Sequence, residues 1–298
     1  MTLPTLLNQL INGLQSGSIY ALVALGYSMV YGIILLLNFA HGDIIMVGAY
    51  AAWMCMVNFN LHPLLSVLVA VLASTVVGVL IEKVAYTPLR SAPRLSLLIT
   101  AIGISFLLEN GCQLIFGSGA KDMTAAIAPL TGGSAVKLGS VTLNFTAMLT
   151  LAVSVLSMAG LTFLVNRTRM GKAMRAVSED MGAAQLMGIS LNRTISNTFA
   201  IGSALAGIGA VLYLCAYPQA SPMMGSMLGL KAFVAAVLGG IGSIPGAMIG
   251  GFAIGITEAL VSAMGLSVWK DGVVFAILIL VLLVRPTGIM GRKIVEKV

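Results

Sequence analysis

The chain has 298 residues, of which 59% are hydrophobic and only 8% charged, and its mean hydropathy is +1.05. Soluble domains carry about 25% charged residues, because polar groups must cover their surface. The net charge of +7 is not arranged as a basic stripe with interleaved aromatic residues, which argues against a nucleic-acid partner. The composition therefore predicts one integral membrane domain over residues 1–298, in contact with membrane lipid and with no separate soluble domain.

Long apolar segments follow one another along the chain. A membrane-spanning helix needs about 20 apolar residues, whereas the strands of a membrane barrel alternate over about ten. The segment 229–264 is too long for one crossing, and Gly239-Gly240 and Pro245-Gly246 divide it into two helices or half-helices. We expect an all-α polytopic bundle of about eight transmembrane helices with glycine-broken half-helices, from apolar segments at 6–37, 42–57, 63–82, 96–115, 144–165, 194–216, 229–264 and 272–285.

Between the first two apolar segments the chain reads "LLLNFAHGDIIMVGAY", with Asn38, His41, Gly42 and Asp43 close together. Ionisable groups in lipid cost several kcal/mol unless they are paired or hydrated. One interpretation is a helix interrupted at Gly42 beside the translocation path, with the three polar side chains bonding to freed backbone groups. The other is an interfacial turn that places His41 and Asp43 at the lipid headgroups.

Two more acids lie in apolar segments. Glu109, with Asn110 beside it, and Glu258 both fall toward the predicted external ends of their segments. An acid inside the membrane indicates a functional group by default. An interfacial position near a helix end explains both acids equally well.

Glycine is abundant, with 34 residues. Small residues let membrane helices approach closely, because packing drives their association in lipid. Gly13-x-x-x-Gly17 and Gly251-x-x-x-Gly255 have the spacing of such contacts. Gly242, Gly246 and Gly250 follow one another at four-residue spacing, which would place them on one helix face. The predicted helix-packing glycines near the break are Gly239, Gly240, Gly242, Gly246 and Gly250.

Lysine and arginine gather in three regions, which are typical of cytoplasmic loops. These regions are 83–95, 166–193 and the C-terminus, whereas the first 82 residues contain neither residue type. We therefore expect a cytoplasmic C-terminus and an external N-terminus.

The segment 166–193 reads "NRTRMGKAMRAVSEDMGAAQLMGISLNR" and is the largest predicted cytoplasmic loop. Its middle is predicted to form a short amphipathic helix that exposes small residues, among them Val177 and Ala184, and that stops at Gly188. Such a helix suits docking into a groove on a partner protein.

Other chemistry lacks support in the sequence. His41 and His62 are the two histidines, and no Cys/His/Asp/Glu cluster has metal-ligand spacing, so we expect no metal site. There is no G-x-S-x-G sequence and no evident Ser–His–Asp set, so an enzyme is not expected. There is also no Walker A sequence, so any ATP that drives this protein is hydrolysed on another chain.

Four separated stretches together resemble the permease subunits of branched-chain amino acid ABC importers of the LivH type. They are "MVYGIILLLNFAHGDIIMVGAY", "RMGKAMRAVSEDMGAAQLMGI", "KAFVAAVLGGIGSIPGAMIGG" and "RPTGIMG", in the family's order and over nearly the whole chain. The resemblance implies a bundle of about eight helices in a bacterial inner membrane. It also implies three kinds of partner: a second, homologous permease, two cytoplasmic ATPase subunits that bind ATP and Mg²⁺, and a periplasmic or extracellular substrate-binding protein.

The resemblance also implies a coupling helix in the 166–193 loop, where the family class has an E-A-A-x-x-x-G type signature. Here glycine stands at the acidic position of that signature and the downstream I-x-L-P part is absent. The residues implied in coupling to the ATPases are Gly171, Arg175, Glu179, Asp180, Ala183, Ala184 and Gly188.

The expected function is import of leucine, isoleucine and valine by alternating access. Three alternatives stay open: a permease of the same architecture for urea, amides or another small solute, an ion-coupled secondary transporter using Asp43, Glu109 or Glu258, and a membrane-embedded enzyme. The coupling-like loop favours the two ABC permeases. The sequence does not tell which residues line the path or whether the chain pairs with itself or with a homologue.

Overall fold

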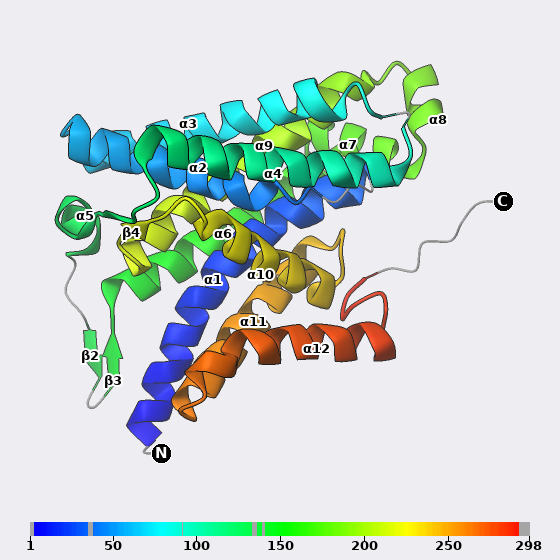
Figure 1. Cartoon of the computed structure of the whole chain (residues 1–298). Coiled ribbons are helices and arrows are strands. Elements are labelled where there is room, and N and C mark those ends of the chain that lie inside the picture. The colour runs from blue at the N-terminus through cyan, green and yellow to red at the C-terminus, as the bar shows by residue number, and fades with distance from the viewer. Residues whose placement is uncertain (1–2, 35–37, 91, 133–135, 139–140, 292–298) are drawn as a thin grey trace.

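The computed structural model describes residues 3–34, 38–90, 92–132, 136–138 and 141–291 and is almost wholly helical (Figure 1). The long helices are α1 (Leu3–Ile34), α3 (Pro63–Ile81), α4 (Arg94–Phe116), α6 (Phe145–Arg167), α9 (Leu191–Ala216) and α11 (Ile244–Ala263). The shorter ones are α2 (His41–Trp53), α5 (Thr124–Thr131), α7 (Arg169–Glu179), α8 (Met181–Leu186), α10 (Met224–Gly239) and α12 (Lys270–Val284).

Seven helical segments of the described chain are long and apolar enough to cross a membrane, and α10 is a shorter apolar helix of 16 residues. The crossing segments contain α1, α3, α4, α6, α9, α11 and α12. Two helices continue into π-helical turns: α2 into η1 (Met54–Asn58) and α3 into η2 (Glu82–Tyr86). The prediction of an all-α polytopic bundle is confirmed.

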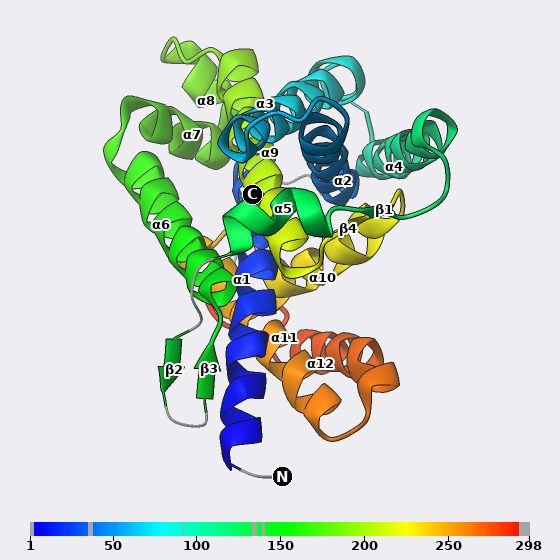
Figure 2. The ribbon, with the colours of Figure 1, turned by 90° about the vertical axis from the view of Figure 1, so that its left-hand side faces the viewer.

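Helix α1 crosses α11 through the two predicted glycine pairs. A Cβ at Gly13 would lie 2.9 Å from the carbonyl oxygen of Gly255, and one at Gly17 would lie 2.9 Å from that of Gly251. The two backbones therefore touch where neither helix carries a side chain, which is how small residues join helices in lipid. Figure 2 shows α1 in the middle of the molecule, with α6 at one edge and α4 at the other.

The predicted division of 229–264 is confirmed, since α10 ends at Gly239 and α11 begins at Ile244. Gly240 has a φ of +105°, which favours glycine, and Pro245 lies in the first turn of α11, where its missing N–H costs nothing. Gly246 and Gly250 pack against the backbone of α10. The expectation that Gly242 lines the same helix face was wrong, because Gly242 lies in the turn, with a φ of +89°.

The chain just after α12 closes this turn. Ile289 and Met290 donate their backbone N–H groups to the carbonyl oxygens of Leu238 and Gly239, each at 2.9 Å. Gly32 of α1 also lies against Gly242, and Gly242 donates its N–H to the hydroxyl of Ser28 at 2.9 Å. The ends of α1, α10 and α12 therefore meet at one end of the molecule.

Short elements gather at the other end. β1 (Lys121–Asp122) pairs antiparallel with β4 (Gln219–Ala220), and β2 (Val136–Leu138) pairs with β3 (Val141–Leu143) in a hairpin. Figure 1 shows β2, β3 and α5 on the left, the side on which the N-terminus lies, whereas α8 and the end of α12 lie on the right.

Candidate functional site

The junction between α1 and α2 holds the polar residues of the "NFAHGD" stretch. Helix α2 begins at His41, so the break in the helix precedes Gly42 and the expectation of an interruption at Gly42 was wrong. Gly42 lies in the first turn of α2, where a Cβ would stand 2.8 Å from Cα of Gly229. Residues 35–37 lie outside the described residues.

Asn38, His41 and Asp43 are buried, with 2%, 2% and 0% of their surface exposed, so the alternative of an interfacial turn does not hold. Their side chains do not cap the helix as expected, because α2 has no side-chain cap. Asn38 instead accepts a hydrogen bond from the hydroxyl of Tyr86 at 2.9 Å, and Asp43 accepts one from Ser105 at 2.5 Å. The junction therefore ties α2 to η2 and to α4.

The ring of His41 fits into a notch on α1. It meets the ring of Tyr27 edge to face, with centroids 4.8 Å apart, and a Cβ at Gly26 would collide with it. His41 Nε2 has no hydrogen-bond partner within the described part of the chain. The residue is thus a packed histidine of the interior in this conformation.

Glu109 is buried rather than interfacial, with 3% of its surface exposed. It accepts a hydrogen bond from the hydroxyl of Ser226 on α10. Together with the Asp43–Ser105 bond, this contact joins α4 to the rest of the bundle through polar groups. Much of the remaining α4 surface is apolar and exposed, including Phe106, Leu107 and Leu114.

A buried ion network joins four helices, and its central residue was not found from the sequence. The Nζ of Lys231 on α10 lies 2.7 Å from Oε1 of Glu258 on α11 and 2.8 Å from Oδ1 of Asp271 on α12. Tyr20 on α1 donates its hydroxyl to the second oxygen of Glu258 at 2.8 Å. The signal in the sequence is a lone lysine inside an apolar segment, which is costly unless it is paired.

A second network, also missed, lies at the end of the molecule that carries α7 and α8. Glu82 is fully buried in η2, and its Oε1 accepts from the guanidinium of Arg90 at 2.5 Å and from Thr87 at 2.7 Å. Ser196 of α9 donates to its other oxygen at 2.6 Å, and Arg90 also bonds Asn192 at 2.5 Å. This network fixes the end of α3 to the start of α9.

The predicted coupling segment forms two helices, so the expectation of one helix ending at Gly188 was wrong. Helix α7 is capped by Thr168, whose hydroxyl oxygen accepts from the N–H of Gly171 at 3.0 Å. Gly171 packs against the last carbonyl groups of α6, and Arg175 donates to the carbonyl oxygen of Val165. Gly171 and Arg175 therefore hold α7 against α6. Glu179 is the last residue of α7, and its side chain is exposed.

Asp180 separates the two helices, because its side chain caps α8 by accepting from the N–H of Ala183 at 3.0 Å. Gly188 follows α8 with a φ of +81° and donates to the carbonyl oxygen of Gln185. The sequence predicted that Val177 and Ala184 are exposed, and this was wrong, because both are buried against the protein. Exposed instead are Leu186 of α8, at 90%, and the following Met187, at 83%, together with the small Ala183.

The described residues contain no group of three His, Cys, Asp or Glu side chains placed to hold a metal ion. His62 caps α3, with Nδ1 accepting from the N–H of Leu64 at 3.3 Å, and lies far along the chain from His41. Cys55, Cys112 and Cys215 are buried and free.

Comparison with known proteins gives the family. Residues 9–282 match the model of the family described as "Branched-chain amino acid transport system / permease component". The chain belongs to this family of membrane permeases. The resemblance seen in the sequence is therefore confirmed, and the family's members are transport components rather than enzymes.

Individual relatives of the permease agree with this assignment. It is 47% identical to the high-affinity branched-chain amino acid transport system permease protein BraD of Pseudomonas aeruginosa, over 98% of both chains. It is 47% identical to LivH of Escherichia coli K12, over 98% of this chain and 97% of the relative. A probable LivH of Methanocaldococcus jannaschii is 30% identical over 92% and 89%. No solved structure matched the chain.

Proposed function

We propose that this chain is the permease subunit of an ATP-driven importer that moves leucine, isoleucine and valine into the cytoplasm. The observation that carries the proposal is the α7–α8 segment, which packs on the membrane helices and presents Leu186 and Met187 outward at one end of the bundle. Its position supports a docking role toward a protein outside the membrane. The printed names of the relatives support branched-chain amino acids as the substrate class.

The orientation proposed here places α7, α8 and the segment after α12 in the cytoplasm and the N-terminus outside. The basic residues support it. Arg90, Arg167, Arg169, Lys172, Arg175, Arg193 and Arg285 lie in the segments that meet at the α8 end of the bundle. Lysine and arginine in excess mark the cytoplasmic side of membrane proteins.

The proposed mechanism is alternating access driven from the cytoplasm. Two ATPase subunits, which bind ATP and Mg²⁺ themselves, would close on one another and move the helices docked on them. Because α8 packs on α7 and α9, and α7 packs on α1, α6 and α9, movement of α8 would reach α9 directly and α1 and α6 through α7. Rigid-body motion of those helices against α2, α3 and α10 would open and close the path.

Besides the two ATPase subunits, the proposal implies two further kinds of partner. A second permease, homologous to this one, would complete the path, and a periplasmic or extracellular binding protein would deliver the amino acid from outside.

The buried junction at Asn38, His41, Gly42 and Asp43 would act as a fixed polar element of the path, since it links α2 to α4 and η2.

The test is purification of the tagged chain in mild detergent, followed by reconstitution into vesicles with the proteins that copurify. We expect two ATPases and a second permease to copurify. With the binding protein added outside the vesicles, we expect uptake of ¹⁴C-leucine that requires ATP and is not competed by urea. Purification of the chain alone, or uptake competed by urea and not by isoleucine, would contradict the proposal.

A further inference from the structure

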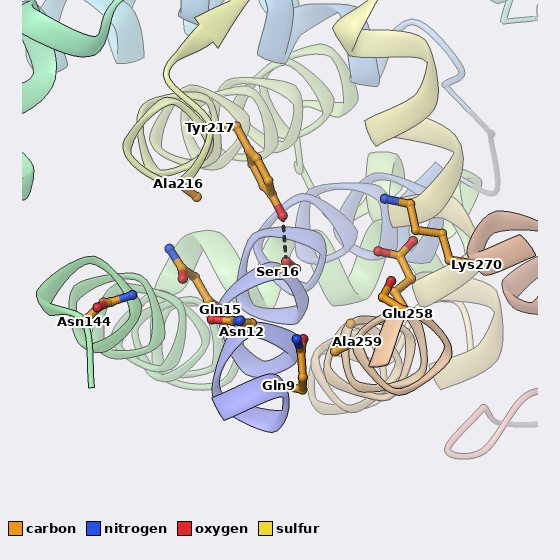
Figure 3. A pocket seen from close by; sticks show the side chains of 12 residues that line it. Gln9, Asn12, Gln15, Ser16, Asn144, Ala216, Tyr217, Glu258, Ala259 and Lys270 are labelled. Atoms are coloured by element: carbon orange, nitrogen blue, oxygen red, sulfur yellow. Dashed lines mark hydrogen bonds between the residues drawn. The ribbon is translucent and has the colours of Figure 1, made fainter. Parts of the chain in front are cut away.

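A polar cavity of about 400 Å³ opens between α1, α6, α9, α11 and α12 (Figure 3). Pockets for small ligands have volumes of about 300 to 1,000 Å³, so this one can hold a small organic solute. Its rim includes Asn144 at the start of α6, Tyr217 at the end of α9 and Lys270 at the start of α12. The cavity therefore lies at the end of the bundle opposite α7 and α8.

Amide side chains line the cavity without partners of their own. Gln9, Asn12 and Gln15 come from one side of α1, at the three-residue spacing that keeps side chains on one helix face. Within the described part of the chain, these three side chains and that of Asn144 make no hydrogen bond, whereas neighbouring Ser16 bonds Tyr217 at 3.1 Å. Amide side chains without a hydrogen-bond partner on a membrane helix cost free energy unless they bond water or a polar ligand.

Opposite charges lie on the far side of the same cavity. Figure 3 shows Glu258 and Lys270 on the side of the cavity across from Gln15 and Asn144. The ion network holds Glu258 in place through Lys231 and Tyr20. Lys270 forms no ion pair with any described carboxylate, so its positive charge is available to a ligand.

We propose that this cavity binds the zwitterionic backbone of the transported amino acid on the outer side of the membrane. This inference rests on the proposed function and assigns its substrate a place in this chain. The α-carboxylate would bind Lys270 and amide N–H groups, and the α-ammonium would bind Glu258 and amide oxygens. A charged group in such a site gains its strongest contacts from charge-assisted hydrogen bonds.

The residues that line the cavity provide no apolar site for a branched aliphatic side chain. Its apolar part consists of Gly255, Ala216, Ala259 and the ring of Tyr217, and no leucine, isoleucine, valine or phenylalanine lines it. A site that selects a branched aliphatic side chain would surround it with such residues. The cavity would therefore bind the ammonium and carboxylate groups that all α-amino acids share, and it would not discriminate between leucine and alanine.

The test is ligand binding to the complete, purified importer without its binding protein, because the binding protein would otherwise impose its own selectivity. Saturation-transfer NMR would follow L-leucine, with L-alanine, 3-methylbutylamine and 4-methylpentanoate as competitors. Each analogue of the last pair lacks one charge of the zwitterion. We expect L-alanine to compete as well as unlabelled leucine, and both single-charge analogues to compete poorly.

Two variants locate the site. Lys270→Gln and Asn12→Leu should each weaken leucine binding about tenfold, the effect of losing a hydrogen bond to a charged group. The matched control is Lys121→Gln, which removes a lysine of the same end of the molecule from its place over the ring of Trp53, outside the cavity. Copurification of the partners shows that each variant has folded and assembled.

The outcomes separate the two proposals. If the intact wild-type importer takes up leucine but Lys270→Gln and Asn12→Leu bind it normally, the cavity proposal is overturned and the proposed function stands. Strong competition by 3-methylbutylamine or 4-methylpentanoate would also overturn the zwitterion site. If the wild-type complex takes up no branched-chain amino acid, the proposed function fails and the cavity assignment falls with it.

Discussion

Lys231 on α10 and Glu258 on α11 form an ion pair of 2.7 Å in which only 8% of each side chain is exposed. The lysine shares its charge with Asp271 on α12, and Tyr20 on α1 bonds the glutamate from the other side. The pair therefore joins α10 to α11, the contact with Asp271 adds α12, and the tyrosine adds α1. Because only 8% of each side chain is exposed, Lys231 or Glu258 is poorly hydrated when it loses its partner, so each depends on the other.

Lys231→Met is expected to lower the free energy of unfolding by about 3 kcal/mol, because it leaves Glu258 buried without its counter-charge. The measurement is denaturation of the purified permease in mixed micelles with increasing SDS. The control Lys172→Met removes an exposed lysine of α7 and should change the free energy little.

Adding Glu258→Gln to Lys231→Met should recover part of the stability, since no buried charge then lacks its partner on α11. Asp271 is about a third exposed and can be hydrated. A single Lys231→Met variant as stable as the wild type would show that the pair contributes nothing.

The crossing of α1 and α11 gives a second prediction. Gly17→Ala would place a Cβ 2.9 Å from the backbone of Gly251 and Phe252, so the helices must separate or bend. We expect a loss of about 1–3 kcal/mol, as for other overpacked sites. Thermal denaturation in detergent measures it as a lower Tm.

The matched control for this variant is Gly160→Ala in α6, where a Cβ meets nothing within 4 Å. Both substitutions gain the same helix propensity, about 1 kcal/mol over glycine. The difference between the two Tm changes therefore isolates the contact with α11. Equal changes would mean that this crossing has room for a methyl group.

Hydropathy predicted the helices well, because the thickness of the lipid imposes their length. The segments 63–82, 96–115 and 144–165 agree with α3, α4 and α6 to within a few residues. The break of 229–264 was also predictable, since glycine and proline act on the local backbone. These features depend on nearby residues alone.

The partners of the buried polar groups could not be predicted in the same way. Tyr86 lies 48 residues from Asn38, Ser105 lies 62 residues from Asp43, and Tyr20 lies 238 residues from Glu258. A single sequence shows that these groups are costly but not which helix supplies the partner. The Asp180 cap is different, because its partner Ala183 lies only three residues away and aspartate is a common N-cap residue, so this local signal was overlooked.

The Glu82 network supplies a third prediction. Glu82→Leu would leave Arg90, Thr87 and Ser196 without their acceptor and is expected to cost about 2 kcal/mol. Because these bonds fix the end of α3 to α9, proteolysis of the loop after η2 should become faster. Glu82→Gln keeps one acceptor oxygen and should show a smaller loss in both measurements.

Arg90→Met serves as a comparison, since the Arg90 side chain is about a quarter exposed whereas Glu82 is fully buried. Removing the arginine should destabilise the permease more than Glu82→Leu does. Arg90→Met leaves a fully buried carboxylate without its counter-charge, whereas the arginine left by Glu82→Leu is partly exposed and can be hydrated. A wild-type rate of proteolysis in Glu82→Leu would contradict the proposed tie between α3 and α9.

The last prediction concerns the segment proposed to meet the ATPases. Leu186→Asp places a charge on the most exposed apolar side chain of α8 and should reduce the ATPase that copurifies by about tenfold, the order expected for an apolar anchor of an interface. Ser178→Asp, an exposed serine of α7, is the control and should leave copurification unchanged.

Gly188→Pro and Arg175→Glu test transmission rather than docking. Proline cannot adopt the φ of +81° found at Gly188 and lacks the N–H that bonds Gln185. Glutamate at 175 cannot donate to the carbonyl oxygen of Val165, so α7 loses its hold on α6. Both variants should insert normally yet hydrolyse ATP without leucine uptake, because α8 no longer moves α6 and α9. Normal uptake by both would exclude a coupling role for α7 and α8.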